Sequence, residues 1–78
     1  MPEQTLAQLK VGASATVKDV SGDPQLQQRL LEMGVLPGVT VQVVRFAPLG
    51  DPMEIKVMGY SLSLRKSEAA CVSVEVQA

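Results

Sequence analysis

The side chains that could carry out catalysis in this sequence are few and scattered. Cys71 is the only cysteine and the chain contains no histidine, so neither Cys71 nor any serine has the commonest general base available to it. In a strand, Cys71 would share a face with Ser73 and Glu75, which predicts an ordinary reduced thiol. No glycine-rich segment leads into Lys and Ser or Thr at a helix start, as a phosphate-binding loop requires. We therefore expect no catalytic residues and no enzymatic activity.

Metal binding has equally little support. Without histidine or a second cysteine, only carboxylates and methionines remain as ligands. Met53 and Met58 are an odd number of residues apart, which would place them on opposite faces of one strand. Asp19 and Asp23 are close in sequence, but Asp23 is better explained as a helix cap. We expect no metal site and no bound cofactor.

Three arginines, Arg29, Arg45 and Arg65, could each act as an arginine finger for a partner GTPase. That role requires a loop-borne arginine that reaches into the partner's nucleotide site. Arg29 falls in a predicted helix, where Glu32 three residues later predicts an ion pair. Arg45 and Arg65 fall at predicted strand ends, where a solvated charge is ordinary. The sequence therefore favours structural roles for all three.

Length and composition indicate a single small domain that covers residues 1–78. Apolar residues make up 46% of the chain, seven basic residues face eight acidic ones, and Phe46 and Tyr60 are the only aromatic residues. Nucleic-acid binding draws on clustered Lys and Arg and on stacking rings, which this chain lacks. No apolar run approaches the roughly 20 residues of a membrane span, and residues 1–4 do not resemble a signal peptide. We expect a cytoplasmic protein that is not inserted in the membrane.

The one clear helix signal begins at Asp23. This residue is a good N-cap, and Pro24 suits the first helical position. Leu26, Leu30 and Met33 then recur on one helical face. The helix is expected to end at Gly34, which can adopt the left-handed conformation and bring Val35 against Leu30.

Alternating apolar and polar residues predict short strands on either side of this helix. The first runs from Ser14 to Val20, preceded by a helical turn that buries two leucines after Thr5. Four more follow the helix, and a turn at residues 66–69 precedes the last of them. Their inward-facing residues are expected to be Val39, Val41 and Val43, then Ile55 and Val57, then Leu62 and Leu64, then Val72, Val74 and Val76. The pattern predicts a mostly-β, SH3-like barrel of about five strands with one short helix after the first strand, with a sandwich as the alternative.

Three segments carry a family resemblance. They are RLLEMGVLPG at residues 29–38, APLGDP at residues 47–52 and GYSLSLRKSEA at residues 59–69. Together they resemble the bacterial ferrous iron transport protein A family. The resemblance implies an SH3-like barrel, a cytoplasmic location and a role in ferrous iron uptake. It also implies a partner, the large membrane transporter with a cytoplasmic GTP-binding domain.

Partner-binding residues are sought on loops held by a rigid scaffold. The loop at residues 48–52 contains two prolines and presents Leu49, with Pro48 and Asp51 beside it. Leu36 and Pro37 form a second apolar turn, and the two turns could make one patch if the barrel brings them together. The alternative is that Leu49 folds back and plugs one end of the barrel.

Three functions remain open at this stage. The leading interpretation is an accessory protein that binds the transporter and supports or regulates it. The others are an Fe(II) metallochaperone and a module that binds nucleic acid or Pro-rich peptides, and balanced charge and few aromatic rings argue against the last. The sequence also leaves open whether the protein weakly self-associates. It does not indicate whether the protein affects the transporter's GTP hydrolysis, assembly or gating.

Overall fold

Six strands form within residues 4–76, the part of the chain that the computed structural model describes, and all except the first carry alternating apolar residues. Residues 1–3, on which the signal-peptide expectation depends, and residues 77–78 lie outside the described residues. In chain order the elements are β1 (Gln4–Thr5), the 3₁₀ helix η1 (Leu6–Gln8), β2 (Ser14–Val20), α1 (Pro24–Glu32), β3 (Thr40–Phe46), β4 (Met53–Val57), β5 (Tyr60–Leu64), α2 (Lys66–Ala69) and β6 (Val72–Val76).

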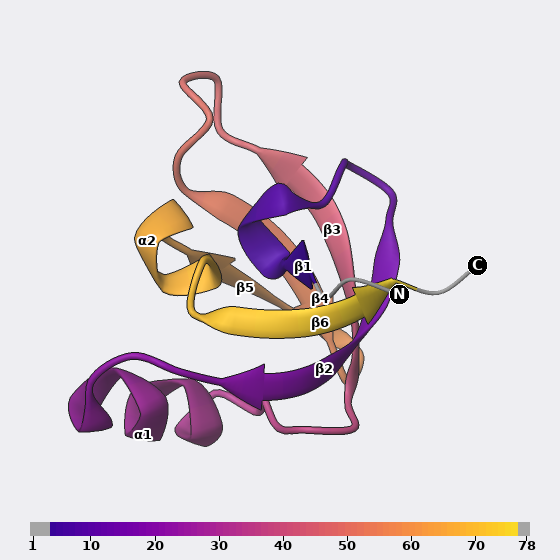
Figure 1. Ribbon diagram of the computed structural model, residues 1–78. Helices are drawn as coiled ribbons and strands as arrows, with labels where there is room; N and C mark the ends of the chain where they lie inside the picture. Colours follow the sequence, from indigo (N-terminus) through magenta and orange to yellow (C-terminus); the bar gives the residue numbers. More distant parts are fainter. Residues whose placement is uncertain (1–3, 77–78) are drawn as a thin grey trace.

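The strands form one antiparallel sheet in the order β1-β6-β2-β3-β4-β5. Its register sets apolar residues of neighbouring strands opposite one another, for example Val41 opposite Val57 and Val17 opposite Val74. Figure 1 shows the strands wrapping around a common interior. They do so because a sheet with one apolar face must bury that face. The predicted barrel with a helix after its first long strand is confirmed, and a two-sheet sandwich is excluded.

The core lies inside this curved sheet. Its buried apolar residues are Leu6, Leu9, Ala15, Val17, Leu30, Val35, Val41, Val43, Met53, Ile55, Val57, Leu64, Ala69, Val72 and Val74. The sheet supplies most of them, and η1, α1 and α2 add side chains that close its openings. Val76, predicted to face inward, is 42% exposed because it is the last residue of β6. Val39 and Leu62 pack against the core but are only partly buried.

Helix α1 has the two ends that the sequence predicts. The Asp23 carboxylate accepts a hydrogen bond from the N–H of Leu26 at 2.8 Å, and Pro24 occupies the first helical position. At the other end Gly34 has φ +92°, and the N–H of Val35 donates to the carbonyl of Leu30 at 2.9 Å. With nine residues, α1 is the longest helix, and none within residues 4–76 is long and apolar enough to cross a bilayer.

Truncating a core side chain should test this assignment directly. Leu30 and Val57 are both 0% exposed, so replacing either with alanine leaves a cavity in a domain with little stability in reserve. We expect Leu30→Ala and Val57→Ala each to lower the free energy of unfolding by about 2–4 kcal/mol in urea titrations. Lys56→Ala, at an exposed position on the same strand as Val57, serves as the control and should change it by less than about 0.5 kcal/mol. A truncated variant as stable as the control would contradict the assignment.

Candidate functional site

The β3–β4 loop, residues 47–52, is a narrow and internally bonded projection. The N–H of Ala47 donates to the carbonyl of Pro52 at 2.9 Å, and the N–H of Gly50 donates to the carbonyl of Ala47 at 2.7 Å. Gly50 has φ +88°, a conformation that glycine adopts without penalty. At the tip, Leu49 is 96% exposed. Leu49 therefore does not plug the barrel, and the loop presents an apolar side chain on a fixed backbone.

Helix α2 supports this loop from the side. The Asp51 carboxylate accepts a hydrogen bond from the backbone N–H of Lys66, the first residue of α2, at 3.0 Å. The ammonium group of Lys66 lies over the Phe46 ring, 5.7 Å from its centroid. Asp51 thus caps α2 from outside, and the loop and helix hold each other in place.

A buried carboxylate then ties α2 to α1. Glu68 is 7% exposed and is the only buried charged residue among residues 4–76. One of its oxygens lies 2.8 Å from the guanidinium of Arg29, and the other accepts the backbone N–H of Arg65 at 2.9 Å. The expected pairing of Arg29 with Glu32 is wrong, because Glu68 offers a charge partner with little access to water. The loop, α2 and α1 therefore form one connected support.

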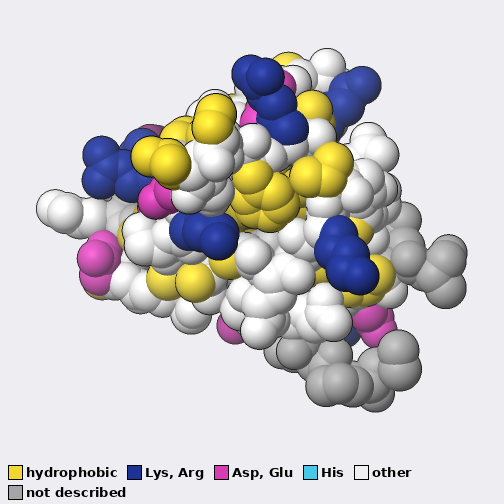
Figure 2. All heavy atoms as spheres, turned by 90° about the horizontal axis from the view of Figure 1, so that it is seen from above, with side chains coloured by type: hydrophobic (Ala, Val, Ile, Leu, Met, Phe, Trp, Pro, Cys, Tyr) yellow, Lys and Arg dark blue, Asp and Glu magenta, His cyan; other side chains and the backbone are white. Residues whose placement is uncertain are grey.

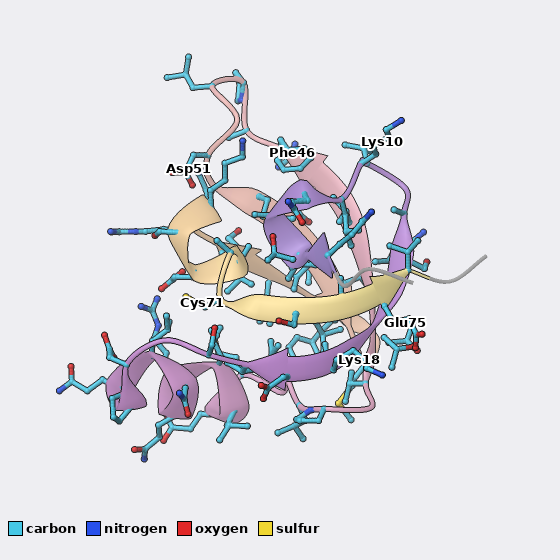
Figure 3. All side chains as sticks on the ribbon, viewed as in Figure 1. Lys10, Lys18, Phe46, Asp51, Cys71 and Glu75 are labelled. Atoms are coloured by element: carbon cyan, nitrogen blue, oxygen red, sulfur yellow. The ribbon has the colours of Figure 1, made fainter. Side chains whose placement is uncertain are left out.

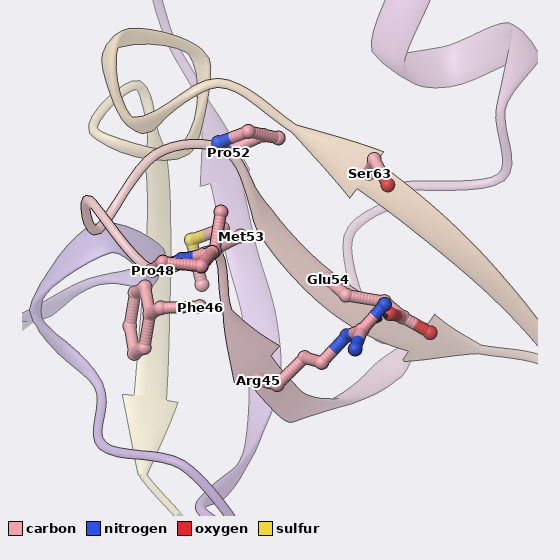
Figure 4. A pocket seen from close by; sticks show the side chains of 8 residues that line it. Arg45, Phe46, Pro48, Pro52, Met53, Glu54 and Ser63 are labelled. Carbon is pink, nitrogen blue, oxygen red and sulfur yellow. Dashed lines mark hydrogen bonds and ion pairs between the residues drawn. The ribbon is translucent and has the colours of Figure 1, made fainter.

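A shallow pocket opens beside the same loop (Figure 4). Its lining is mixed, with apolar side chains next to the loop and the ion pair of Arg45 and Glu54, 2.9 Å apart, on the other side. The lining residues are Arg45, Phe46, Ala47, Pro48, Pro52, Met53, Glu54 and Ser63. Such a pocket offers apolar contact to a partner, with polar groups that fix its orientation.

The structure separates the predicted partner-binding residues into two groups. Pro48, Leu49 and Asp51 belong to the β3–β4 loop, whereas Leu36 and Pro37 belong to the connection between α1 and β3. Figure 1 shows these two segments at opposite ends of the molecule, so they do not form the single patch that the sequence suggested. The barrel's closure, rather than chain order, decides which turns meet.

Sequence reasoning missed an apolar surface near the α1–β3 connection. Met58 is 68% exposed in the β4–β5 turn and has φ 51°, which is unusual for a residue other than glycine. The hydroxyl of Tyr60 donates to the carbonyl of Met33, which joins this hairpin to the end of α1. A Cβ added at Gly34 would lie 2.7 Å from that hydroxyl, so glycine is required there for the close approach as well as for the turn. The alternation of Ile55 and Val57, and then of Leu62 and Leu64, predicted the two strands of this hairpin, but nothing in it indicates that Tyr60 meets the end of α1.

Metal-ligating chemistry is sparse in the folded chain. Within residues 4–76, no three Asp, Glu, Cys or His side chains gather closely enough to hold an ion. The thiol of Cys71 is partly buried and lies 3.6 Å from the carbonyl of Ser67. The β3–β4 loop and its supports therefore remain the best-defined candidate site, and what they offer is a binding surface.

Comparison with known proteins gives these features a context. The model of the FeoA domain matches residues 4–76. A curated relative from Porphyromonas gingivalis, an Fe(2+) transport protein A/Fe(2+) transporter FeoB fusion protein, is 41% identical over 91% of this chain. The chain spans only 8% of the length of that relative.

Solved structures agree with the fold. The FeoA protein of Chlorobium tepidum is 39% identical with a TM-score of 0.90, and the match covers 96% of this chain and 71% of that one. The FeoA of Stenotrophomonas maltophilia, solved in complex with zinc and described as a prokaryotic SH3 domain protein, is 33% identical with a TM-score of 0.81 over 92% of this chain and 89% of that one. The predicted SH3-like fold is confirmed.

The cap between the loop and α2 can be tested by removing its acceptor. Asp51→Ala deletes the oxygen that receives the Lys66 N–H, whereas Asp51→Asn keeps an acceptor at the same place. We expect hydrogen exchange of the Lys66 amide to accelerate about fivefold or more in Asp51→Ala, as the loss of about 1 kcal/mol would produce, and far less in Asp51→Asn. Equal protection in both variants would show that Asp51 does not hold α2.

Proposed function

We infer the function from the premise that this chain belongs to the FeoA domain family. The protein is a small accessory component of ferrous iron uptake, and it acts by docking on a FeoB-like membrane transporter that carries a cytoplasmic GTP-binding domain. It supports or regulates that transporter and has no catalytic activity of its own. Docking on this region places it in the cytoplasm.

The observation that carries this proposal is the fusion relative. In that protein a domain similar to this chain shares one polypeptide with the transporter FeoB, so the two stay close by covalent linkage. Such a linkage is useful only if the domain's own surface meets the transporter, because a tether raises the effective concentration without supplying a contact. The Stenotrophomonas relative is described as possibly acting as a bacterial ferrous iron transport activating factor, which supports the same direction.

The β3–β4 loop is the surface that suits this docking best. An exposed apolar side chain on a fixed backbone loses little conformational freedom when it binds, so more of its burial energy appears as affinity. Leu49 meets both conditions, because it is 96% exposed and its loop is bonded internally and to α2. Pro48 and Asp51 shape the loop, and Leu36 and Pro37 would belong to a separate contact.

Iron carriage is the second candidate, favoured by one observation. The Stenotrophomonas relative was solved in complex with zinc, which shows that a metal ion associates with that protein. This chain offers no cluster of ligands among residues 4–76, so docking remains the favoured proposal. Stoichiometric retention of Fe(II) after desalting would reverse the preference.

Docking through Leu49 is tested by Leu49→Ser. Because this side chain contacts solvent rather than the core, the melting temperature should stay within about two degrees of the parent. Co-purification of the tagged protein with the detergent-solubilised transporter should fall at least fivefold, as the loss of buried apolar area predicts. Leu31→Ser, at an exposed position on α1, is the matched control and should still co-purify. A stable Leu49→Ser protein that co-purifies normally would remove Leu49 from the interface.

The absence of enzymatic activity is a separate prediction. We expect the purified protein to release no phosphate from GTP or ATP above the level of a buffer blank, because it has no phosphate-binding loop. The measurement is a phosphate-release assay with Mg²⁺ across successive column fractions. Turnover that follows the protein peak, and is lost in a well-folded point variant, would contradict it.

A further inference from the structure

Two lysines without ion-pair partners among residues 4–76 lie at the end of the barrel from which the β3–β4 loop projects. Lys10 and Lys66 are exposed, and the ion pairs within residues 4–76 engage Lys18, Arg29 and Arg45 instead. Figure 3 shows Lys10, Phe46 and Asp51 at the upper end of the barrel, the end from which the loop projects, with Lys10 and Asp51 on either side of Phe46 in that view. Lys66 belongs to this end through its contact with Phe46. We call this end the Leu49 face, made of Lys10, Phe46, Leu49, Asp51 and Lys66.

The Leu49 face is positive although the whole protein is not. The chain has a net charge of −1, yet this face sets two lysines, Lys10 and Lys66, against one acidic residue, Asp51. Figure 2, which looks down on this end, shows hydrophobic atoms near the middle with Lys and Arg side chains around them and a few Asp and Glu side chains in between. An apolar centre with a charged rim is the usual anatomy of a protein-binding surface.

We propose that the transporter receives Leu49 in an apolar recess bordered by carboxylates. This inference rests on the proposed function and adds the chemistry of the partner's surface. Acidic side chains beside the recess would meet Lys10 on one side of the loop and Lys66 on the other. Charges at a rim contribute mainly to the rate and orientation of encounter, while the buried apolar contact slows dissociation.

An anionic membrane surface is the competing occupant of a cationic face with an apolar tip. Proteins that anchor in the headgroup layer present several large apolar or aromatic side chains. The projecting loop offers one leucine, whose complete burial is worth about 1.5–3 kcal/mol. A single rigid side chain instead fits a recess of its own size in a folded partner. The observations therefore favour a protein surface over lipid.

The test compares two substitutions with the same change in charge. Lys10→Glu and Lys56→Glu each lower the net charge by two, but Lys56 lies on β4 outside the Leu49 face and has no ion pair among the described residues. Binding is measured as association rate to the full-length transporter in nanodiscs of neutral lipid, at low and high salt. We expect Lys10→Glu to reduce the rate about three- to tenfold at low salt and Lys56→Glu to leave it near the parent value. The difference should shrink at about 0.5 M salt, where screening is strong.

Other outcomes overturn the inference, and each identifies what failed. Equal rates for the two variants, with Leu49→Ser still defective, would reject the acidic border while the docking proposal stands. Binding of the parent protein to anionic vesicles that lack the transporter, weakened by Lys10→Glu, would assign the face to lipid. A parent protein that binds neither would reject both the proposed function and the inference. Melting curves of all variants confirm that each is folded.

Discussion

The buried carboxylate of Glu68 connects the parts of this molecule that strand pairing leaves unconnected. It accepts the N–H of Arg65 and pairs with Arg29, so one side chain spans the start of α2 and the middle of α1. Removing a carboxylate from water costs free energy unless its hydrogen bonds and its charge are satisfied. Glu68 therefore needs both partners to stay buried, and loss of either would leave its charge poorly compensated. Helix α2 has only four residues, far too few to be stable without tertiary contacts. The position of α2 therefore depends on the Glu68–Arg29 ion pair toward α1 and on the hydrogen bond from Lys66 to Asp51 in the loop. The support of the β3–β4 loop depends on the same two contacts.

The barrel supplies the rigid frame on which this support stands. A domain of this size buries a limited share of its surface, so each apolar face must be used. The sheet does so by curving around its own side chains, with Leu30 from α1 and Leu6 from η1 closing the gaps. This rigid core positions the turns, and the β3–β4 loop projects from two paired strands.

Local signals account for most of what the sequence predicted correctly. Asp23, Pro24 and Gly34 mark both ends of α1, and alternation defines β2 from Ser14 to Val20, because caps and two-residue periodicity act over a few neighbouring residues. The missing pieces are set by distant contacts. Helix α2 needs Asp51, fifteen residues earlier in the chain, and Arg29 pairs with a carboxylate from a different element.

The candidate site was predictable to the same degree. Two prolines identified the loop, and the family resemblance supplied the iron and the transporter, which composition and spacing could not. Neither the separation of Leu36 from Leu49 nor the meeting of Tyr60 with the end of α1 has a sequence signature, because both follow from how the sheet closes.

The energetics of the Leu49 face suggest a reason for fusion in the relative. If the Leu49 face docks as proposed, one buried leucine and a few rim charges would yield a modest affinity once the cost of association is met. A domain attached to its partner avoids much of that cost through its high effective concentration, which fits the single polypeptide of the fusion relative.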